Sequence, residues 1–154
     1  MLQTRGETVD VEQEDCVVND IDAEVETSGL GPCIGVAIIY KNRVSLIHTA
    51  GADEASTFDG FCDEVDQVIR REDRSSIQPI VAGGEYDDFP VDAERKRAHV
   101  IAKLQGMGFG SPQIVWCPPD HVQTITVDCT RKTATVESWN YVTDADGLSV
   151  QLEF

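Results

Sequence analysis

Basic residues are scarce in this chain of 154 residues, which has 12 Lys+Arg against 28 Asp+Glu and a formal net charge of −16. A polyanion gains nothing from contact with phosphates, so this scarcity argues against nucleic-acid partners and adhesion to anionic lipid. Long hydrophobic runs are also missing. The longest, Ile34 to Tyr40, contains Gly35 and is far shorter than the ~20 residues of a membrane span. No apolar leader follows Met1, so we expect a cytoplasmic protein without a membrane partner.

Paired cysteine motifs are absent as well. The cysteines are odd in number and no two of them form a CxxC pair: Cys16, Cys33, Cys62, Cys117 and Cys129. This pattern is typical of reduced thiols and leaves at least one cysteine available as a nucleophile. Cys117 and Cys129 with His121 match no closed four-ligand zinc pattern, and the loop at Asp144 lacks the last carboxylate of a calcium loop. We therefore expect neither a metal nor a cofactor.

The acidic residues are concentrated at the amino terminus. Residues 1–26 contain nine acids and one base, whereas the rest of the chain is more evenly balanced. We interpret residues 1–15 as an acidic, partly disordered arm. Residues 16–154 have the length of one ordinary domain, so we predict a single domain with no internal linker.

Hydrophobic periodicity predicts an order of strands, helix, strand, helix and strands. Alternating or β-branched segments predict strands at 21–27, 33–40, 43–48, 77–82, 113–117, 121–129, 132–139 and 147–154. Helical stripes of apolar residues cover 58–72 and 92–105. Pro79 favours an edge position or a bulge for the strand at 77–82. The fold class predicted is α/β, a single layered domain with one mixed, largely antiparallel sheet and two main helices.

The first hairpin places a cysteine and a histidine on one face. If Tyr40 to Arg43 form the turn, Gly35 lies opposite His48, and Cys33 faces the same side as His48 with Cα atoms roughly 7–8 Å apart. An imidazole at that distance can activate a thiol for nucleophilic attack. The alternative interpretation is that Cys33 is a small buried apolar residue and His48 an ordinary strand residue.

These residues resemble a family. The segment Thr27-Ser-Gly-Leu-Gly-Pro-Cys33-Ile-Gly-Val, followed by a strand that ends in His48, is similar to the T-x-x-L-G-S-C-V-x-V segment and downstream histidine of the chemoreceptor glutamine deamidases (CheD). That fold resembles the catalytic domains of the cytotoxic necrotizing factors. The likeness extends over roughly residues 17–137, but only Thr27 to His48 is specific. The family's serine before the cysteine is Pro32 here.

The resemblance implies roles for particular residues. It makes Cys33 the nucleophile, His48 its base and Thr27 the polar group that holds the imidazole, with Ser28 as a substitute for Thr27 if the register is shifted by one. It also puts substrate-binding residues at the following positions: Ser28, Gly31, Gly83, Gly84 and Glu85. Glu85, Asp87 and Asp88 are otherwise interpreted as solvated loop acids, or alternatively as the lining of a substrate groove that favours a basic partner. The negative charge of the chain should raise the pKa of Cys33 and favour the protonated form of His48.

The function implied is a protein-glutamine deamidase that works through a Cys-His thioester. His48-Thr-Ala-Gly also resembles the segment around the histidine of protein N-terminal asparagine amidohydrolases, so such an enzyme is an alternative. Two further alternative functions are an acyl or peptide hydrolase that uses the same Cys-His dyad and a catalytically silent binding module. The expected partner is a protein substrate with an accessible Gln or Asn and a basic surface, and we expect the deamidase itself to be a monomer.

Overall fold

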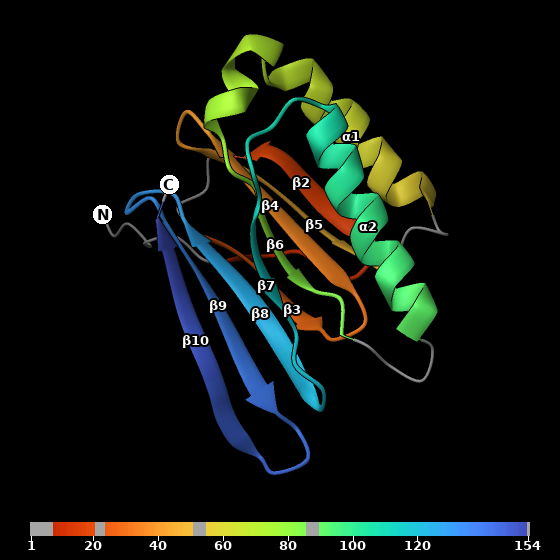
Figure 1. Cartoon of the computed structure of the whole chain (residues 1–154). Helices are drawn as coiled ribbons and strands as arrows, with labels where there is room; N and C mark the ends of the chain where they lie inside the picture. The colour runs from red at the N-terminus through yellow and green to blue at the C-terminus, as the bar shows by residue number, and fades with distance from the viewer. Residues whose placement is uncertain (1–7, 21–23, 51–54, 86–89, 154) are drawn as a thin grey trace, which may run out of the picture.

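A computed structural model describes residues 8–20, 24–50, 55–85 and 90–153 (Figure 1). Ten strands within these residues form two five-stranded sheets. Sheet A contains, in spatial order, β1 (Val9–Asp10), β3 (Glu24–Leu30), β8 (His121–Asp128), β9 (Thr133–Asn140) and β10 (Ala145–Glu153). Sheet B contains β2 (Asp15–Asp20), β5 (Arg43–Thr49), β4 (Ile34–Tyr40), β6 (Ile80–Gly83) and β7 (Gln113–Trp116). The helices are α1 (Ala55–Val68), the short 3₁₀ helix η1 (Arg71–Ser76) and α2 (Pro90–Gly106).

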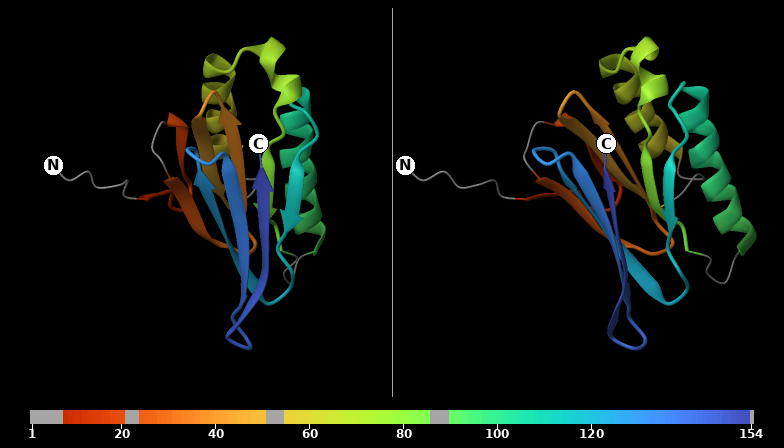
Figure 2. Two further views of the ribbon diagram at one scale, coloured as in Figure 1. Left: turned by 90° about the vertical axis from the view of Figure 1, so that its left-hand side faces the viewer. Right: turned by 60° about the vertical axis from the view of Figure 1, so that its left-hand side comes forward.

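The α/β class and the prevalence of antiparallel pairs are confirmed, but the prediction of one sheet is wrong. The two sheets pack face to face, and α1 and α2 cover the other face of sheet B (Figure 2). Only β1–β3 and β6–β7 are parallel pairs among the described strands. Alternation in the sequence shows which side of a strand is apolar, but it does not reveal which strands are neighbours, and therefore it could not separate the two sheets.

The β4–β5 hairpin has the predicted register. Tyr40 pairs with Arg43 and Gly35 with His48. The turn residues Lys41 and Asn42 have φ angles of 51° and 63°. Two successive left-handed residues form the type I′ turn, whose twist matches that of the strands it joins.

Other boundaries differ from the predictions. β6 lies inside sheet B between β4 and β7, and its pairing with both strands is regular, so neither the edge position nor the bulge predicted from Pro79 is found. The proline precedes the first residue of the strand, where its missing N–H breaks no ladder bond, and its carbonyl accepts a hydrogen bond from Gln113 N–H at 2.7 Å. α1 ends at Val68, and the chain then forms η1 where the helix was expected to reach residue 72.

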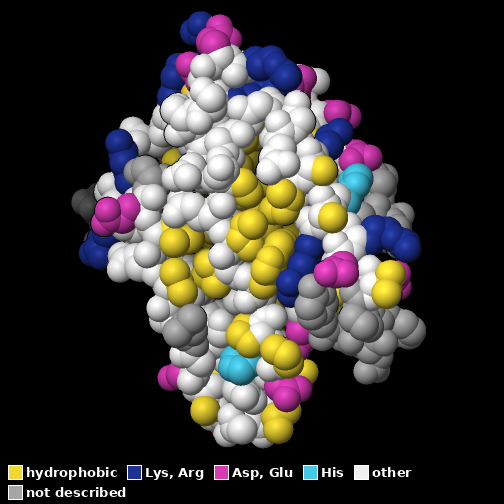
Figure 3. Space-filling model, in the orientation of Figure 1, with side chains coloured by type: hydrophobic (Ala, Val, Ile, Leu, Met, Phe, Trp, Pro, Cys, Tyr) yellow, Lys and Arg dark blue, Asp and Glu magenta, His cyan; other side chains and the backbone are white. Residues whose placement is uncertain are grey.

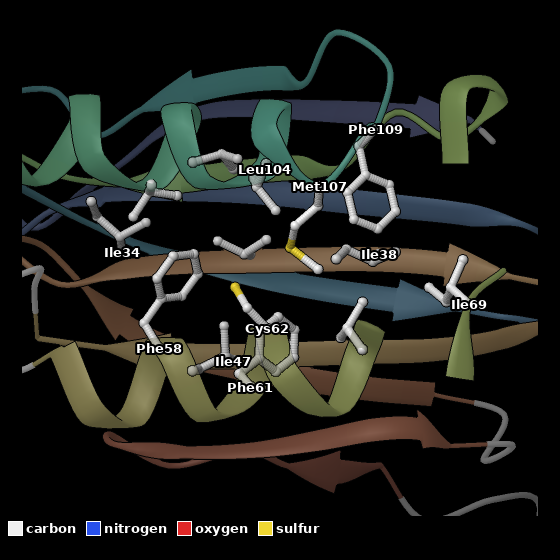
Figure 4. Packing of buried hydrophobic residues seen from close by; sticks show 14 residues of the cluster. Ile34, Ile38, Ile47, Phe58, Phe61, Cys62, Ile69, Leu104, Met107 and Phe109 are labelled. Carbon is white, nitrogen blue, oxygen red and sulfur yellow. The ribbon is translucent and has the colours of Figure 1, made fainter. Parts of the chain in front are cut away.

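Two apolar layers stabilise the arrangement. The first lies between sheet B and the helices and contains Phe58, Phe61 and Cys62 of α1 and Leu104 of α2 (Figure 4). The second lies between the two sheets and includes Leu46 of β5. Successive residues of β4 alternate between the two layers, because side chains of a strand point to opposite faces.

The layer between the sheets reaches the surface along one side of the molecule. In Figure 3, hydrophobic side chains gather in the centre of the face, over the strands at the middle of Figure 1. Val115 and Leu152, which pack against this layer, are only partly buried. Within the described residues, no helix is both long and apolar enough to cross a membrane.

The predicted arm falls partly outside the described residues, which begin at Thr8. From there the chain contributes β1 to sheet A and, from Asp15, β2 to sheet B. Val11, between the two strands, is only 2% exposed. The connection between the sheets is therefore part of the packed structure.

Arg74 joins the carboxyl ends of α1 and α2. It is 2% exposed, and its guanidinium donates to the carbonyls of Asp66, Ile69 and Met107 at 2.7–3.1 Å. It also pairs with the Asp66 carboxylate at 2.9 Å. Helix-end carbonyls need such partners because they have none within the helix.

Replacing Arg74 with Ala should lower the free energy of unfolding by roughly 2–4 kcal/mol, because the carbonyls would stay buried without donors. Urea denaturation monitored by circular dichroism measures the change. The control is Arg70→Ala, which removes an exposed cation paired with Glu72 and should have little effect. Equal stability of the two variants would contradict the role assigned to Arg74.

Candidate active site

Cys33 and His48 lie at the same end of the β4–β5 hairpin. Cys33 immediately precedes β4, and His48 is the second-to-last residue of β5. Cys33 packs against the apolar layer between the sheets, and His48 follows Val44 and Leu46 of that layer at intervals of two residues. Both side chains therefore lie on the face of sheet B that faces sheet A, as the register predicted.

Thr27 holds the imidazole from the opposite sheet. Its hydroxyl oxygen lies 2.8 Å from Nδ1 of His48 and 2.6 Å from the carbonyl oxygen of Val11. A carbonyl only accepts, so the single hydroxyl proton of Thr27 must be donated to Val11. The hydroxyl oxygen then accepts a hydrogen bond from Nδ1–H. This chain of two bonds fixes the tautomer with Nδ1–H and leaves an unprotonated Nε2.

The Nε2 atom of His48 is buried and has no hydrogen-bond partner in the described part of the chain. His48 as a whole is only 3% exposed. The Cys33 sulfur is not hydrogen-bonded to Nε2 here, and catalytic hydrogen bonds are commonly long before substrate binds. A buried nitrogen lone pair without a donor is costly in a purely structural residue but suits a general base.

Burial keeps both groups uncharged at rest. It lowers the pKa of His48, and the negative charges of Glu14 and Asp10 only partly oppose the effect. Burial also raises the pKa of the Cys33 thiol, with a further rise from Glu14 and a smaller opposite effect from Lys96. The nearby carboxylates shift the pKa values of both groups in the directions expected from the sequence, but at His48 the opposite effect of burial is larger. The resting pair is a neutral thiol and a neutral imidazole.

A glycine-containing segment after β6 clamps the loop that carries Cys33. Gly84 N–H donates to Cys33 O at 2.9 Å, and Glu85 N–H donates to Gly31 O at 2.8 Å. At Gly83, where φ is 86°, a Cβ atom would lie 2.0 Å from Cys33 O. Only glycine permits this approach.

Glu85 is buried, so its interpretation as a solvated loop acid is wrong. It is 8% exposed, and its carboxylate accepts a hydrogen bond from Asp120 N–H at 2.8 Å. A Cβ on Gly31 would lie 3.5 Å from the same carboxylate. Glu85 thus links the Cys33 loop to the loop before β8. Asp87 and Asp88 lie outside the described residues.

Ser28 differs from the other residues expected to bind substrate. It is exposed and receives a hydrogen bond from the Thr124 hydroxyl at 3.3 Å, on the side of sheet A that faces away from the core. Gly31, Gly83 and Gly84 are buried. The structure therefore brings Thr27 and His48 into contact and sets Cys33 on their side, while Gly83 to Glu85 hold the loop.

Sequence reasoning missed two contributors, Val11 and Glu14. The Val11 carbonyl orients the Thr27 hydroxyl. Glu14 N–H donates to His48 O at 2.7 Å, and the Glu14 carboxylate accepts from Ala50 N–H. Both residues fall in the segment interpreted as an arm, and a backbone carbonyl leaves no sequence signal.

The loop with Cys117 and His121 is tied internally. The Cys117 thiol donates to His121 O at 3.2 Å, and His121 Nδ1 donates to Pro119 O at 2.8 Å. Within the described ranges, no three His, Cys, Asp or Glu side chains are grouped to hold a metal ion.

A scan against protein-family models and a search of curated proteins find no match to the chain.

Gly83→Ala should displace the Cys33 loop, because its methyl group would overlap Cys33 O. We expect a loss of roughly 2–3 kcal/mol in the free energy of unfolding and faster proteolysis at this loop. Gly60→Ala is the control, since a Cβ there meets no atom within 4 Å and should stabilise α1 slightly. A Gly83→Ala variant as stable as the wild type would contradict the close approach.

Glu14→Gln should make the Cys33 thiol more acidic, because it removes the like charge but keeps an oxygen that accepts from Ala50. Alkylation by iodoacetamide at pH 8 should become severalfold faster at Cys33, as measured by peptide mapping. Cys62 serves as the internal control because burial raises its pKa to about 12. An unchanged rate at Cys33 would show that Glu14 does not act on the thiol.

Proposed function

We propose that this protein is a cysteine-dependent amidohydrolase that converts the side-chain carboxamide of a protein glutamine to a carboxylate and ammonia. The observation that carries the proposal is the buried His48, whose Nδ1 is fixed by Thr27 and whose Nε2 has no partner in the described part of the chain. Nε2 is thus available to take the proton of the Cys33 thiol.

The first half-reaction forms a thioester. Nε2 of His48 takes the thiol proton while the sulfur of Cys33 attacks the carboxamide carbon. The C–N bond of the tetrahedral adduct then breaks, and nitrogen leaves as ammonia after it receives the proton from Nε2–H. Cys33 remains as a glutamyl thioester, and His48 is neutral again.

The second half-reaction consumes water. Nε2 takes a proton from a water molecule as its oxygen attacks the thioester carbon. The C–S bond breaks, the sulfur recovers the proton from Nε2–H, and the side chain is released as a carboxylic acid that loses its proton to solvent to give glutamate. Because the resting pair is neutral, each half-reaction begins and ends without a separated charge pair in the buried site.

An oxyanion in either adduct needs N–H donors. Gly84 N–H and Glu85 N–H are already engaged with Cys33 O and Gly31 O, and Pro32 has no N–H. The N–H of Cys33 itself is therefore the donor that we assign to the oxyanion. The clamp at Gly83 to Glu85 supports this role by fixing the peptide on the other side of Cys33.

The resemblance to the chemoreceptor glutamine deamidases supports the same reaction and extends it to the fold. In this proposal, residues 16–154 form one deamidase-like domain together with β1, Val11 and Glu14, which pack into the same structure. The five free cysteines suit a reducing compartment such as the cytoplasm. The substrate is a protein, and the enzyme works as a monomer without metal, cofactor or nucleic acid.

Cys33→Ser and His48→Ala should each abolish ammonia release from glutamine peptides. Thr27→Val should lower kcat by roughly 10- to 100-fold, because it removes the bond that fixes the tautomer. Thr27→Ser keeps the hydroxyl and should therefore retain most of the wild-type activity. A coupled ammonia assay and the mass increase of about 1 Da in the peptide measure turnover.

Cys16→Ser is the matched control, since Cys16 is also half-buried but packs against the helix side of sheet B. It should keep full activity, and thermal melts should show all variants folded. Peptides with an internal Gln, peptides with an N-terminal Asn, and simple esters distinguish the deamidase from the asparagine amidohydrolase and the acyl hydrolase. Ammonia release that survives in folded Cys33→Ser would refute the mechanism.

A further inference from the structure

A groove crosses the outer face of sheet A. This face lies on the side away from the helices (Figure 2). Its volume is about 520 Å³. That size falls within the range of ligand-binding clefts. The groove begins at Ser28 and Gly29 of β3 and ends at β10.

Two rows of outward side chains form its floor. Thr124 of β8 pairs with Glu137 of β9, and Glu137 pairs with Ser149 of β10. Trp139 pairs with Asp146 in the next row. Adjacent strands are about 4.8 Å apart, so the three steps from β3 to β10 span about 14 Å, the length of roughly four extended residues.

The groove begins beside the candidate active site. Gly29 lines it, and a methyl group on Gly29 would lie 4.0 Å from Cε1 of His48. Gly29 has a φ of 77° and sits where the pairing of β3 with β8 is irregular. The imidazole whose Nε2 has no partner in the described residues thus lies directly behind a residue without a side chain.

The charge and the aromatic surface of the groove favour a basic ligand. Glu137 and Asp146 line it, and no Lys or Arg does so among the described residues. Trp139 is 40% exposed beside them. A tryptophan face next to carboxylates attracts an arginine or lysine side chain through cation–π and ionic contacts.

We propose that this groove binds an extended basic segment of the substrate protein and presents the adjacent glutamine to His48 and Cys33 past Gly29. The inference rests on the proposed deamidase function. An arginine of the segment stacks on Trp139 and pairs with Glu137 or Asp146. The enzyme therefore selects glutamines that lie within about four residues of basic side chains.

The test uses labelled seven-residue peptides with a central glutamine flanked by two arginines, two serines or two glutamates. Binding to the full-length Cys33→Ser variant is measured by fluorescence anisotropy, which needs no turnover. The arginine peptide should bind roughly fivefold more tightly than the serine peptide at low salt. The preference should disappear at 1 M NaCl, where charges are screened within about 3 Å.

Glu137→Gln combined with Asp146→Asn should abolish the preference for the arginine peptide and leave the binding of the serine peptide unchanged. Trp139→Ala should weaken binding of the arginine peptide severalfold. Asp63→Asn combined with Glu64→Gln is the matched control, since it makes the same charge change on exposed residues of α1. The proposal that the groove binds a basic segment would be overturned if the two double variants had equal effects, or if the Cys33→Ser protein without them showed no preference for the arginine peptide.

The same peptides incubated with the active chain separate this inference from the reaction. A binding preference without the mass increase of about 1 Da would refute the deamidase while leaving the basic-segment site in place. A mass increase that is equally fast for all three peptides would refute the role of the groove in substrate selection but would be consistent with the deamidase reaction. Faster turnover of the arginine peptide through a lower KM supports both.

Discussion

The site depends on one hydrogen bond between the two sheets, from His48 of sheet B to Thr27 of sheet A. A threonine hydroxyl has one proton, which it donates in a hydrogen bond to the Val11 carbonyl, so the imidazole must donate through Nδ1–H. This bond requires the packing of the two sheets, the register of β3 and the path of the amino-terminal segment to be as they are. If any of them shifted, the orientation of Nε2 would no longer be determined.

Burial, more than net charge, sets the chemistry at the centre of the molecule. The chain carries a formal charge of −16, yet the pKa of His48 is lowered because desolvation disfavours the imidazolium more than nearby carboxylates favour it. The proposed reaction accordingly depends on proton transfer between neutral groups. On the outer face of sheet A, in contrast, the carboxylates of Glu137 and Asp146 are exposed.

Local features of the fold were predictable. The two-residue spacing at Lys41-Asn42 determined the register of the β4–β5 hairpin, because a type I′ turn admits one alignment. Apolar periodicity located both helices. The partition into two sheets was not predictable, since strands of either sheet show the same alternation. Pro79 misled for a related reason: its cost depends on where the strand begins, which periodicity does not resolve.

The sequence by itself determined which residue types face one another across the hairpin, because pairing there follows from the turn and the alternation of side chains. Only the tertiary structure decided the state of His48, the inward position of Glu85 and the contribution of Val11. Those outcomes depend on backbone groups and on segments far apart in the chain. Every residue has the same carbonyl, so its use as an acceptor is decided only by packing.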